Sequence, residues 1–93
     1  MAAYDLRFPH SLGAVEASRR VEIELQRLVT EYRLASQTTA ENQYRLFGSG
    51  IDARISVADA EVRIALQLSL VTDMLAGARI RKGLQDGLPG VLA

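Results

Sequence analysis

The sequence contains no cysteine among its 93 residues. Disulfide bonds, thiolate nucleophiles and thiolate metal sites are therefore excluded, and a small domain without such cross-links is typical of a reducing cytosol. A single histidine, His10, is also too few for a metal site that needs several imidazole ligands. These absences predict a cytoplasmic protein without a metal site or a bound cofactor.

An excess of charge of one sign is also lacking. The 11 basic and 11 acidic residues give a formal net charge of zero. Since a phosphate backbone is normally met by a concentrated basic patch, we expect no nucleic-acid partner. The densest basic cluster, Arg79, Arg81 and Lys82, is interpreted as the late end of a helix, where cations oppose the helix dipole. The alternative interpretation is an anion-binding role.

No apolar run is long enough to cross a membrane. The longest one, from Ile64 to Val71, is interrupted by Gln67 and Ser69 and is too short. The N-terminal residues alternate rather than forming a basic stretch before an apolar run, so no secretory signal is expected.

Composition and length predict one globular domain. The chain is 48% hydrophobic and 24% charged, enough apolar material for a core and enough charge for a solvated surface. A chain of 93 residues leaves little room for a second core. We therefore expect a single domain over residues 1–93, with a frayed C-terminal tail from about residue 88.

Two periodicities appear in the first third of the chain. The opening residues alternate in the period-two pattern of a half-buried strand that ends at Pro9. From Ser11, the expected N-cap, apolar residues recur at helical spacing and predict an amphipathic helix over residues 12–32. The inward positions are Tyr4, Leu6 and Phe8 in the strand, and Ala14, Val21, Leu25, Leu28 and Tyr32 in the helix.

The middle of the chain returns to period two and predicts a meander of four strands. Its first strand is polar and weak, which suits the edge of a sheet. The strands are expected at residues 33–38, 44–46, 51–57 and 62–68, with turns at residues 39–42, 48–50 and 58–60.

The last third predicts a second helix from Leu70 to a stop at Gly87 and Pro89. Gly77 and Gly83 inside it each cost about 1 kcal/mol relative to alanine, so either close packing requires them or the helix is locally weak. The order β-α-β-β-β-β-α makes the fold class α+β, an antiparallel sheet with two helices packed on one face.

No residue set predicts catalysis. His10 beside Ser11 is interpreted as a structural pair at the helix entry, because no nucleophile elbow surrounds it. The 48–50 segment leads into a strand, so it is a hairpin turn rather than a phosphate-binding loop. The carboxylates on outer faces and turns lack a desolvated cleft and are interpreted as solvated charges. These carboxylates are Asp52, Asp59, Glu61 and Asp73.

The apolar run from Ile64 to Leu75 leaves two interpretations open. It belongs to the core, or part of it lines a groove or forms a patch for self-association or for a hydrophobic surface. The candidate apolar binding surface consists of Leu70, Val71, Met74, Leu75, Ile80 and Leu84.

Several short segments carry a family resemblance. They are His10-Ser11-Leu12 before the 17–28 helix, the 49–55 segment, Glu61-Val62-Arg63-Ile64, and the 79–84 segment. In these the chain resembles the polyhydroxyalkanoic acid system proteins, small bacterial proteins encoded among the genes for making and using storage polyester granules. The resemblance implies a granule context and implies no enzymatic role.

Two functions are predicted from these observations. The first is a non-enzymatic accessory or binding protein of polyhydroxyalkanoate storage, acting in the cytoplasm at a granule surface or on a granule-associated protein. The alternative is a small helix-grip-like carrier of a hydrophobic ligand such as an acyl chain, although a chain this small uses most apolar residues for its own core. A symmetric homodimer is compatible with either function, and an enzyme ranks third.

Overall fold

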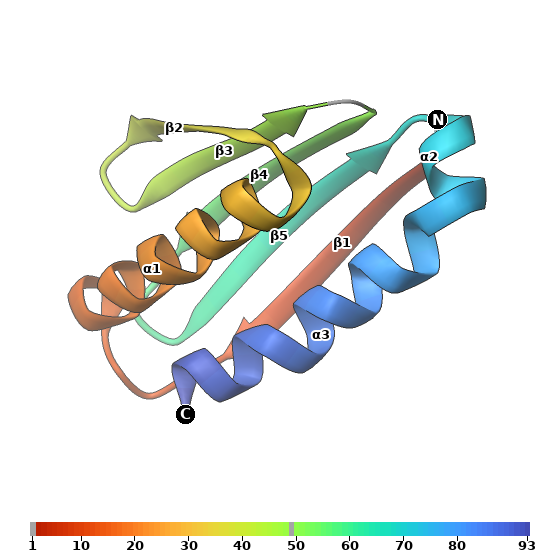
Figure 1. Ribbon diagram of the computed structural model, residues 1–93. Coiled ribbons are helices and arrows are strands. Elements are labelled where there is room, and N and C mark those ends of the chain that lie inside the picture. The colour runs from red at the N-terminus through yellow and green to blue at the C-terminus, as the bar shows by residue number, and fades with distance from the viewer. Residues whose placement is uncertain (1, 49) are drawn as a thin grey trace.

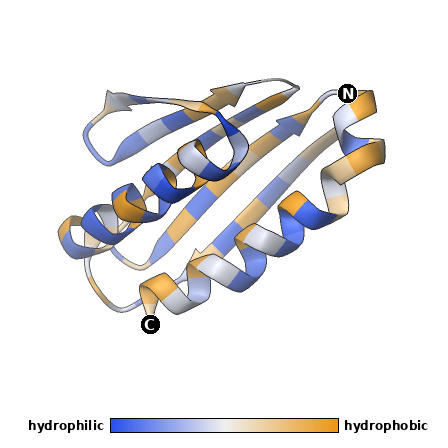
Figure 2. Ribbon diagram, in the orientation of Figure 1, coloured by the Kyte–Doolittle hydropathy of each residue, from blue (hydrophilic) through white to orange (hydrophobic). Residues whose placement is uncertain are grey.

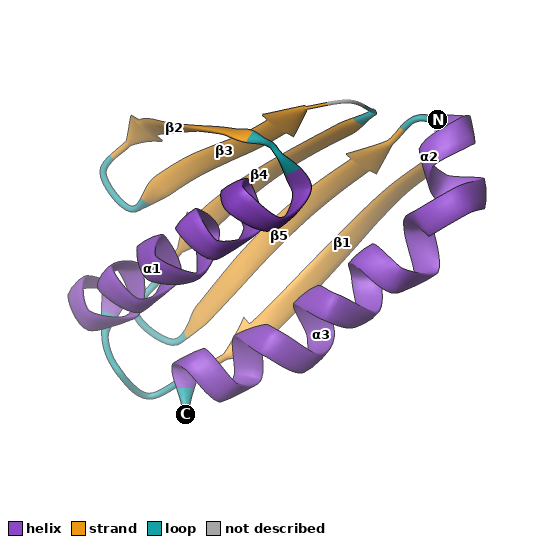
Figure 3. Cartoon of the chain, in the orientation of Figure 1, coloured by secondary structure: helices purple, strands orange, loops and turns teal. Residues whose placement is uncertain are grey.

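A five-stranded antiparallel sheet is the centre of the computed structural model, which describes residues 2–48 and 50–93 (Figure 1). The strand order is β1-β5-β4-β3-β2, so the first and last strands lie side by side. Both long helices cover the same face (Figure 3), which confirms the predicted α+β class and element order. The elements are β1 (Ala2–Pro9), α1 (Ala14–Tyr32), β2 (Ala35–Ala40), β3 (Gln43–Gly48), β4 (Ile51–Val57), β5 (Glu61–Leu68), α2 (Leu70–Thr72), the π-helical η1 (Asp73–Gly77) and α3 (Ala78–Leu92).

The core lies between the sheet and the helices because the strands alternate in hydropathy (Figure 2). In β5 every second side chain points inward, and these four expose no more than 2% of their surface. They are Val62, Ile64, Leu66 and Leu68. Charged residues such as Arg63 alternate with them and face solvent on the side of the sheet that the helices leave uncovered.

The start of α1 differs from the prediction. The N-cap residue is Gly13, with a φ of 80°, and not Ser11. The first helical N–H, that of Ala14, donates to Asp59 Oδ1 over 3.2 Å. Asp59 belongs to the turn between β4 and β5, so the cap comes from a distant part of the chain and the predicted local cap is wrong.

His10 has the structural role that was predicted for it. Its Nδ1 accepts the N–H of Leu12 over 3.2 Å, which leaves Nε2 to donate to the carbonyl of Ala58 over 2.9 Å. The imidazole therefore ties the entry of α1 to the β4–β5 turn.

The polar edge strand is confirmed, although it lies two residues later than predicted. All six residues of β2 are exposed. The delay arises because Arg33 adopts the left-handed conformation, φ 54°, that ends α1. The predicted hairpin at residues 48–50 joins β3 and β4, and its middle residue lies outside the described residues.

The predicted stop of the second helix at Gly87 and Pro89 is wrong, because α3 continues through Pro89 to Leu92. The continuation extends the apolar stripe of α3, since Leu88 and Leu92 are both buried. Proline removes one helical hydrogen bond, and this cost is offset by the burial that follows it. Fraying from about residue 88 stays a prediction.

Arg20 holds the end of α3 against α1. Its Nη1 donates to the carbonyls of Val91 and Ala93 over 3.2 and 2.8 Å. Its Nε also donates to Glu16, and hydrogen bonds from Arg19 and Arg20 lower the pKa of that carboxyl to about 2. The last helical turn is therefore linked to the ion pairs on α1.

The two glycines inside the second helical region serve different purposes. A Cβ at Gly77 would collide with Asp73 Oδ1, whereas a Cβ at Gly83 would meet only the hydroxyl of Tyr32, at 3.8 Å. We expect Gly83→Ala to raise the free energy of unfolding by about 0.5–1 kcal/mol. Gly77→Ala should lower it by about 1 kcal/mol or more, because Asp73 must shift. Urea unfolding of both variants measures the difference, and equal effects would contradict this account.

Candidate functional site

The first candidate site is an exposed apolar surface at the start of the C-terminal helical region. Leu70, Val71, Met74 and Leu75 expose 65%, 67%, 84% and 81% of their surfaces. They lie on α2 and η1 at one end of the molecule (Figure 2), and we call these four residues the apolar end patch. In the 64–75 run the inward strand residues Ile64, Leu66 and Leu68 are core, whereas the apolar helical residues mostly form this surface.

The other two residues of the predicted surface lie elsewhere. Ile80 and Leu84 are each 8% exposed and face the sheet. Their spacing continues to Leu88 and Leu92, so they belong to the buried stripe of α3. The structure therefore brings together four of the six predicted residues and places the remaining two in the core.

Polar contacts anchor the apolar end patch to the sheet. The hydroxyl of Ser69 accepts the N–H of Thr72 over 3.2 Å and caps α2. The hydroxyl of Tyr4 in β1 donates to Asp73 Oδ1 over 2.6 Å, and this hydrogen bond raises the pKa of Tyr4. These contacts fix the first helical turns against the edge of the sheet and leave the apolar side chains outside.

Arg81 completes this anchor. Its guanidinium lies over the ring of Tyr4, 4.3 Å from the centroid, in a cation–π contact. Because α3 extends ten residues beyond Lys82, the basic cluster lies near the beginning of α3 and the predicted role opposite the dipole at the helix C-terminus is wrong. Arg79 and Lys82, the other two members, are exposed.

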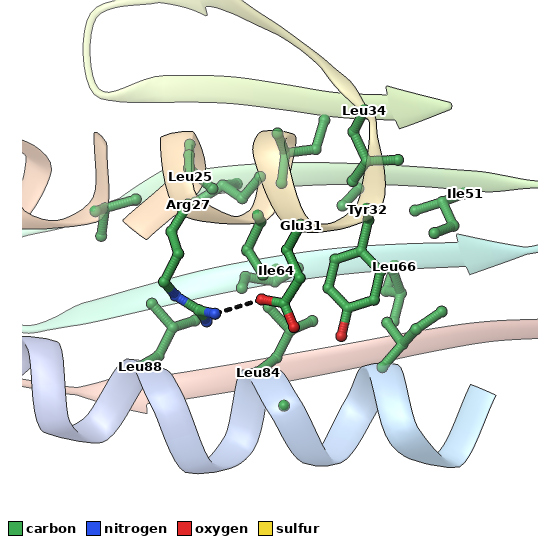
Figure 4. A pocket seen from close by; sticks show the side chains of 17 residues that line it. Leu25, Arg27, Glu31, Tyr32, Leu34, Ile51, Ile64, Leu66, Leu84 and Leu88 are labelled. Atoms are coloured by element: carbon green, nitrogen blue, oxygen red, sulfur yellow. Dashed lines mark hydrogen bonds and ion pairs between the residues drawn. The ribbon is translucent and has the colours of Figure 1, made fainter. Parts of the chain in front are cut away.

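The second candidate site is a cavity of about 110 Å³ between the two long helices and the sheet (Figure 4). Its walls are mainly aliphatic. Leu28 from α1, Ile64 and Leu66 from β5, and Ile80 and Leu84 from α3 are among them. The volume is below the ~300 Å³ at which drug-sized ligand pockets begin.

Polar side chains of α1 form the rim of the cavity. Arg27 donates to both Glu24 and Glu31, and Tyr32 lies one residue further along the helix (Figure 4). The hydrogen bond to Glu24 is the main reason that the pKa of Arg27 is raised. On the α3 side, Gly83 belongs to the lining and contributes no side chain.

The four carboxylates predicted to be solvated form no shared site. Arg45 donates to Asp52 over 3.1 and 2.9 Å and lowers the pKa of its carboxyl. Asp59 caps α1 and Asp73 accepts from Tyr4. Within residues 2–48 and 50–93, no group of three or more His, Cys, Asp or Glu side chains is arranged to hold a metal ion.

No helix in the described part of the chain is both long enough and apolar enough to pass through a membrane.

The chain was compared with known families, proteins and structures. A family model described as "Putative polyhydroxyalkanoic acid system protein" matches residues 5–92. The chain belongs to this family. The match confirms the predicted resemblance and contains both candidate sites, and the family description associates the chain with polyhydroxyalkanoic acid systems. Searches of curated proteins and of solved structures returned no match.

The sequence did not predict the location of the cavity. Its rim combines residues of α1 with Gly83 of α3, which are about 50 positions apart and meet only because both helices pack on one face. The one local signal was Gly83 at an interior helix position, because a glycine there destabilises the helix and usually serves packing or function.

Proposed function

We propose that this protein is a non-enzymatic binding protein of polyhydroxyalkanoate storage, and that the apolar end patch docks on the polyester surface of the granule. The observation that carries the proposal is the exposure of four large apolar side chains on two consecutive helical turns. Contiguous exposed apolar surface of this kind is typical of interaction sites. Family membership supports the choice of a polyester as the partner.

The distribution of charge favours an apolar partner. Between Leu70 and Gly77 the only charged residue is Asp73, whose carboxylate is turned toward Tyr4. The outer side of this segment can therefore be buried without stripping water from an ion, which would be costly.

The expected energy is sufficient for reversible docking. Full burial of one such side chain contributes about 1.5–3 kcal/mol, and four are available. The loss of rotational and translational freedom on binding offsets part of this gain. The anchor through Ser69, Tyr4 and Arg81 reduces the further cost of ordering the patch.

In this proposal the protein acts in the cytoplasm, where storage granules lie. Docking through the apolar end patch leaves α1, the outer face of the sheet and the exposed edge strand β2 directed away from the polyester, where a granule-associated protein or a second copy can bind.

A paired substitution tests the proposal. We expect the double variant Leu70→Gln, Met74→Gln to lose at least about tenfold in affinity for polyhydroxyalkanoate particles, because about 2 kcal/mol of apolar burial is removed. Glutamine forms helices about as well as leucine and methionine, so folding should be unaffected. Co-sedimentation with particles of defined surface area measures the affinity.

A matched control comes from exposed apolar residues of α1, which lie outside the apolar end patch. Val15 and Ile23 on α1 expose 84% and 62% of their surfaces, close to the 84% of Met74 and the 65% of Leu70. Val15→Gln, Ile23→Gln should leave particle binding unchanged. Equal loss of particle affinity in both double variants would indicate nonspecific adsorption. Unchanged affinity in both would contradict docking through the apolar end patch.

A further inference from the structure

The cavity between the helices opens toward a charged groove. The groove between α1 and α3 is lined by Glu31, Tyr32, Arg79, Lys82, Gly83 and Asp86. Glu31, Tyr32 and Gly83 also line the cavity. An aliphatic interior and a polar exterior therefore meet at one opening, and the side chains of Glu31 and Tyr32 reach across it from α1 (Figure 4).

From this arrangement we propose that the protein binds a short-chain carboxylate, with its aliphatic tail in the cavity and its anionic end in the groove beside Arg79 and Lys82. The site shares no residue with the apolar end patch and does not depend on the granule proposal.

The volume determines the length of the tail. An apolar cavity of about 150 Å³ holds the six carbons of benzene, or about 25 Å³ per carbon. A cavity of about 110 Å³ then accommodates about four carbons. Longer fatty acids would have to displace core side chains such as Ile64 and Leu66. The site therefore selects its ligand mainly by the length of the aliphatic tail.

The opening exists because position 83 carries no side chain. The nearest atom to a Cβ built at Gly83 is the hydroxyl of Tyr32, 3.8 Å away. The smallness of Gly83 is therefore not required for helix packing. A larger side chain here would occupy the passage between groove and cavity.

The charges at the groove suit an anionic end group. Within the part of the chain that the structure describes, neither Arg79 nor Lys82 forms an ion pair with a carboxylate. The two acidic groups are Glu31, which is paired with Arg27, and Asp86. A bound carboxylate would therefore have two unpaired cations as partners and one unpaired carboxylate as a neighbour.

An NMR titration of the full chain with butanoate tests the site. We expect saturable shifts of the methyl signals of Leu28, Ile64 and Leu84 and of the amide signal of Gly83. Octanoate should bind more weakly than butanoate because its tail exceeds the volume. The absence of methyl shifts with butanoate, or tighter binding of octanoate at the same methyls, would overturn the proposal.

Substitutions at the opening separate binding from folding. Gly83→Leu should abolish the methyl shifts, whereas Gly83→Ala should retain them, and the amide spectra show whether each variant is folded. Butanoate binding to a folded Gly83→Leu variant with unchanged affinity would overturn the assignment of the opening. Methyl shifts that persist in Gly83→Ala and disappear in a folded Gly83→Leu variant would support the assignment of the opening.

The two parts of the ligand can be tested separately. Arg79→Gln, Lys82→Gln should weaken butanoate binding about fivefold, the effect of two exposed charge contacts. The same variant should bind the uncharged 1-butanol with the same affinity as the unaltered protein. Equal affinity of this variant and the unaltered protein for butanoate would overturn the role of the two cations.

Discussion

A protein that carries alanine at both Leu88 and Leu92 should lose about 3–6 kcal/mol of unfolding free energy. Both side chains are buried, at 2% and 5% exposure, on the last two turns of α3. Replacing one buried leucine with alanine typically costs about 2–5 kcal/mol, and the end of a helix relaxes more readily than the centre of a core. A small domain has only about 5–15 kcal/mol in total, so much of its stability depends on these turns.

Urea unfolding followed by circular dichroism measures this loss. Gly90→Ala is the matched control, because a Cβ at this exposed position meets nothing within 4 Å and should be neutral or slightly stabilising. A frayed tail from about residue 88, as the sequence predicts, would give a loss below about 1 kcal/mol in the double variant. The experiment therefore distinguishes a packed final helix from a frayed one.

Leu68→Ala should lower the free energy of unfolding by about 2–5 kcal/mol. Leu68 is fully buried on β5, where its registered partners are Ala2 of β1 and Ile51 of β4. A Cβ added at Gly77 would lie 3.5 Å from Leu68 Cδ1, so the Leu68 side chain also packs against the side of η1 that faces the sheet. Its truncation leaves a void beneath the helical turns that carry the apolar end patch.

Gln67→Ala provides the comparison for this strand. Gln67 is the preceding residue of β5, points to the uncovered face of the sheet and is exposed. Its loss should change stability by less than about 0.5 kcal/mol. Similar costs for the two substitutions in thermal unfolding would show that the sheet is not buried on one side as described.

Local patterns predicted the elements of this fold well. Alternation over residues 4–8, 51–57 and 62–68 identified three strands and the face that each buries. In a half-buried strand a shift of one residue would turn every apolar side chain toward solvent, so only one face can be the buried one. Helical spacing identified α1 to within two residues at its start. Both signals repeat over several turns or residue pairs, so one exception does not obscure them.

The wrong predictions share a physical origin in distant contacts. Ser11 is a good cap by residue type, but Asp59 from another turn reaches the first helical N–H. Gly87 and Pro89 have the composition of a helix stop, but burial of the leucines that follow and the hydrogen bonds from Arg20 favour a longer helix. Tertiary contacts overrode local preference in each case.

The candidate site could be predicted only in part. Helical spacing alone groups Leu70, Met74, Ile80 and Leu84 near one face of a single regular helix. The structure separates the first pair from the second because the sheet covers the apolar stripe of α3 and leaves the outer side of α2 and η1 uncovered. Which turn of an amphipathic helix extends past the edge of the core depends on the arrangement of the strands, and local spacing carries no information about it.

The pairing of β1 with β5 affects the order in which a newly made chain folds. Strands β2 to β5 each meet a neighbour across a short turn, whereas β1 has no partner until the ribosome has made the residues up to Leu68. Contacts so distant along the chain form slowly, and an unpaired apolar strand is prone to associate with other chains. The first strand in the sequence is therefore the one that completes the sheet, and until β5 has been made its apolar side chains have no strand partner.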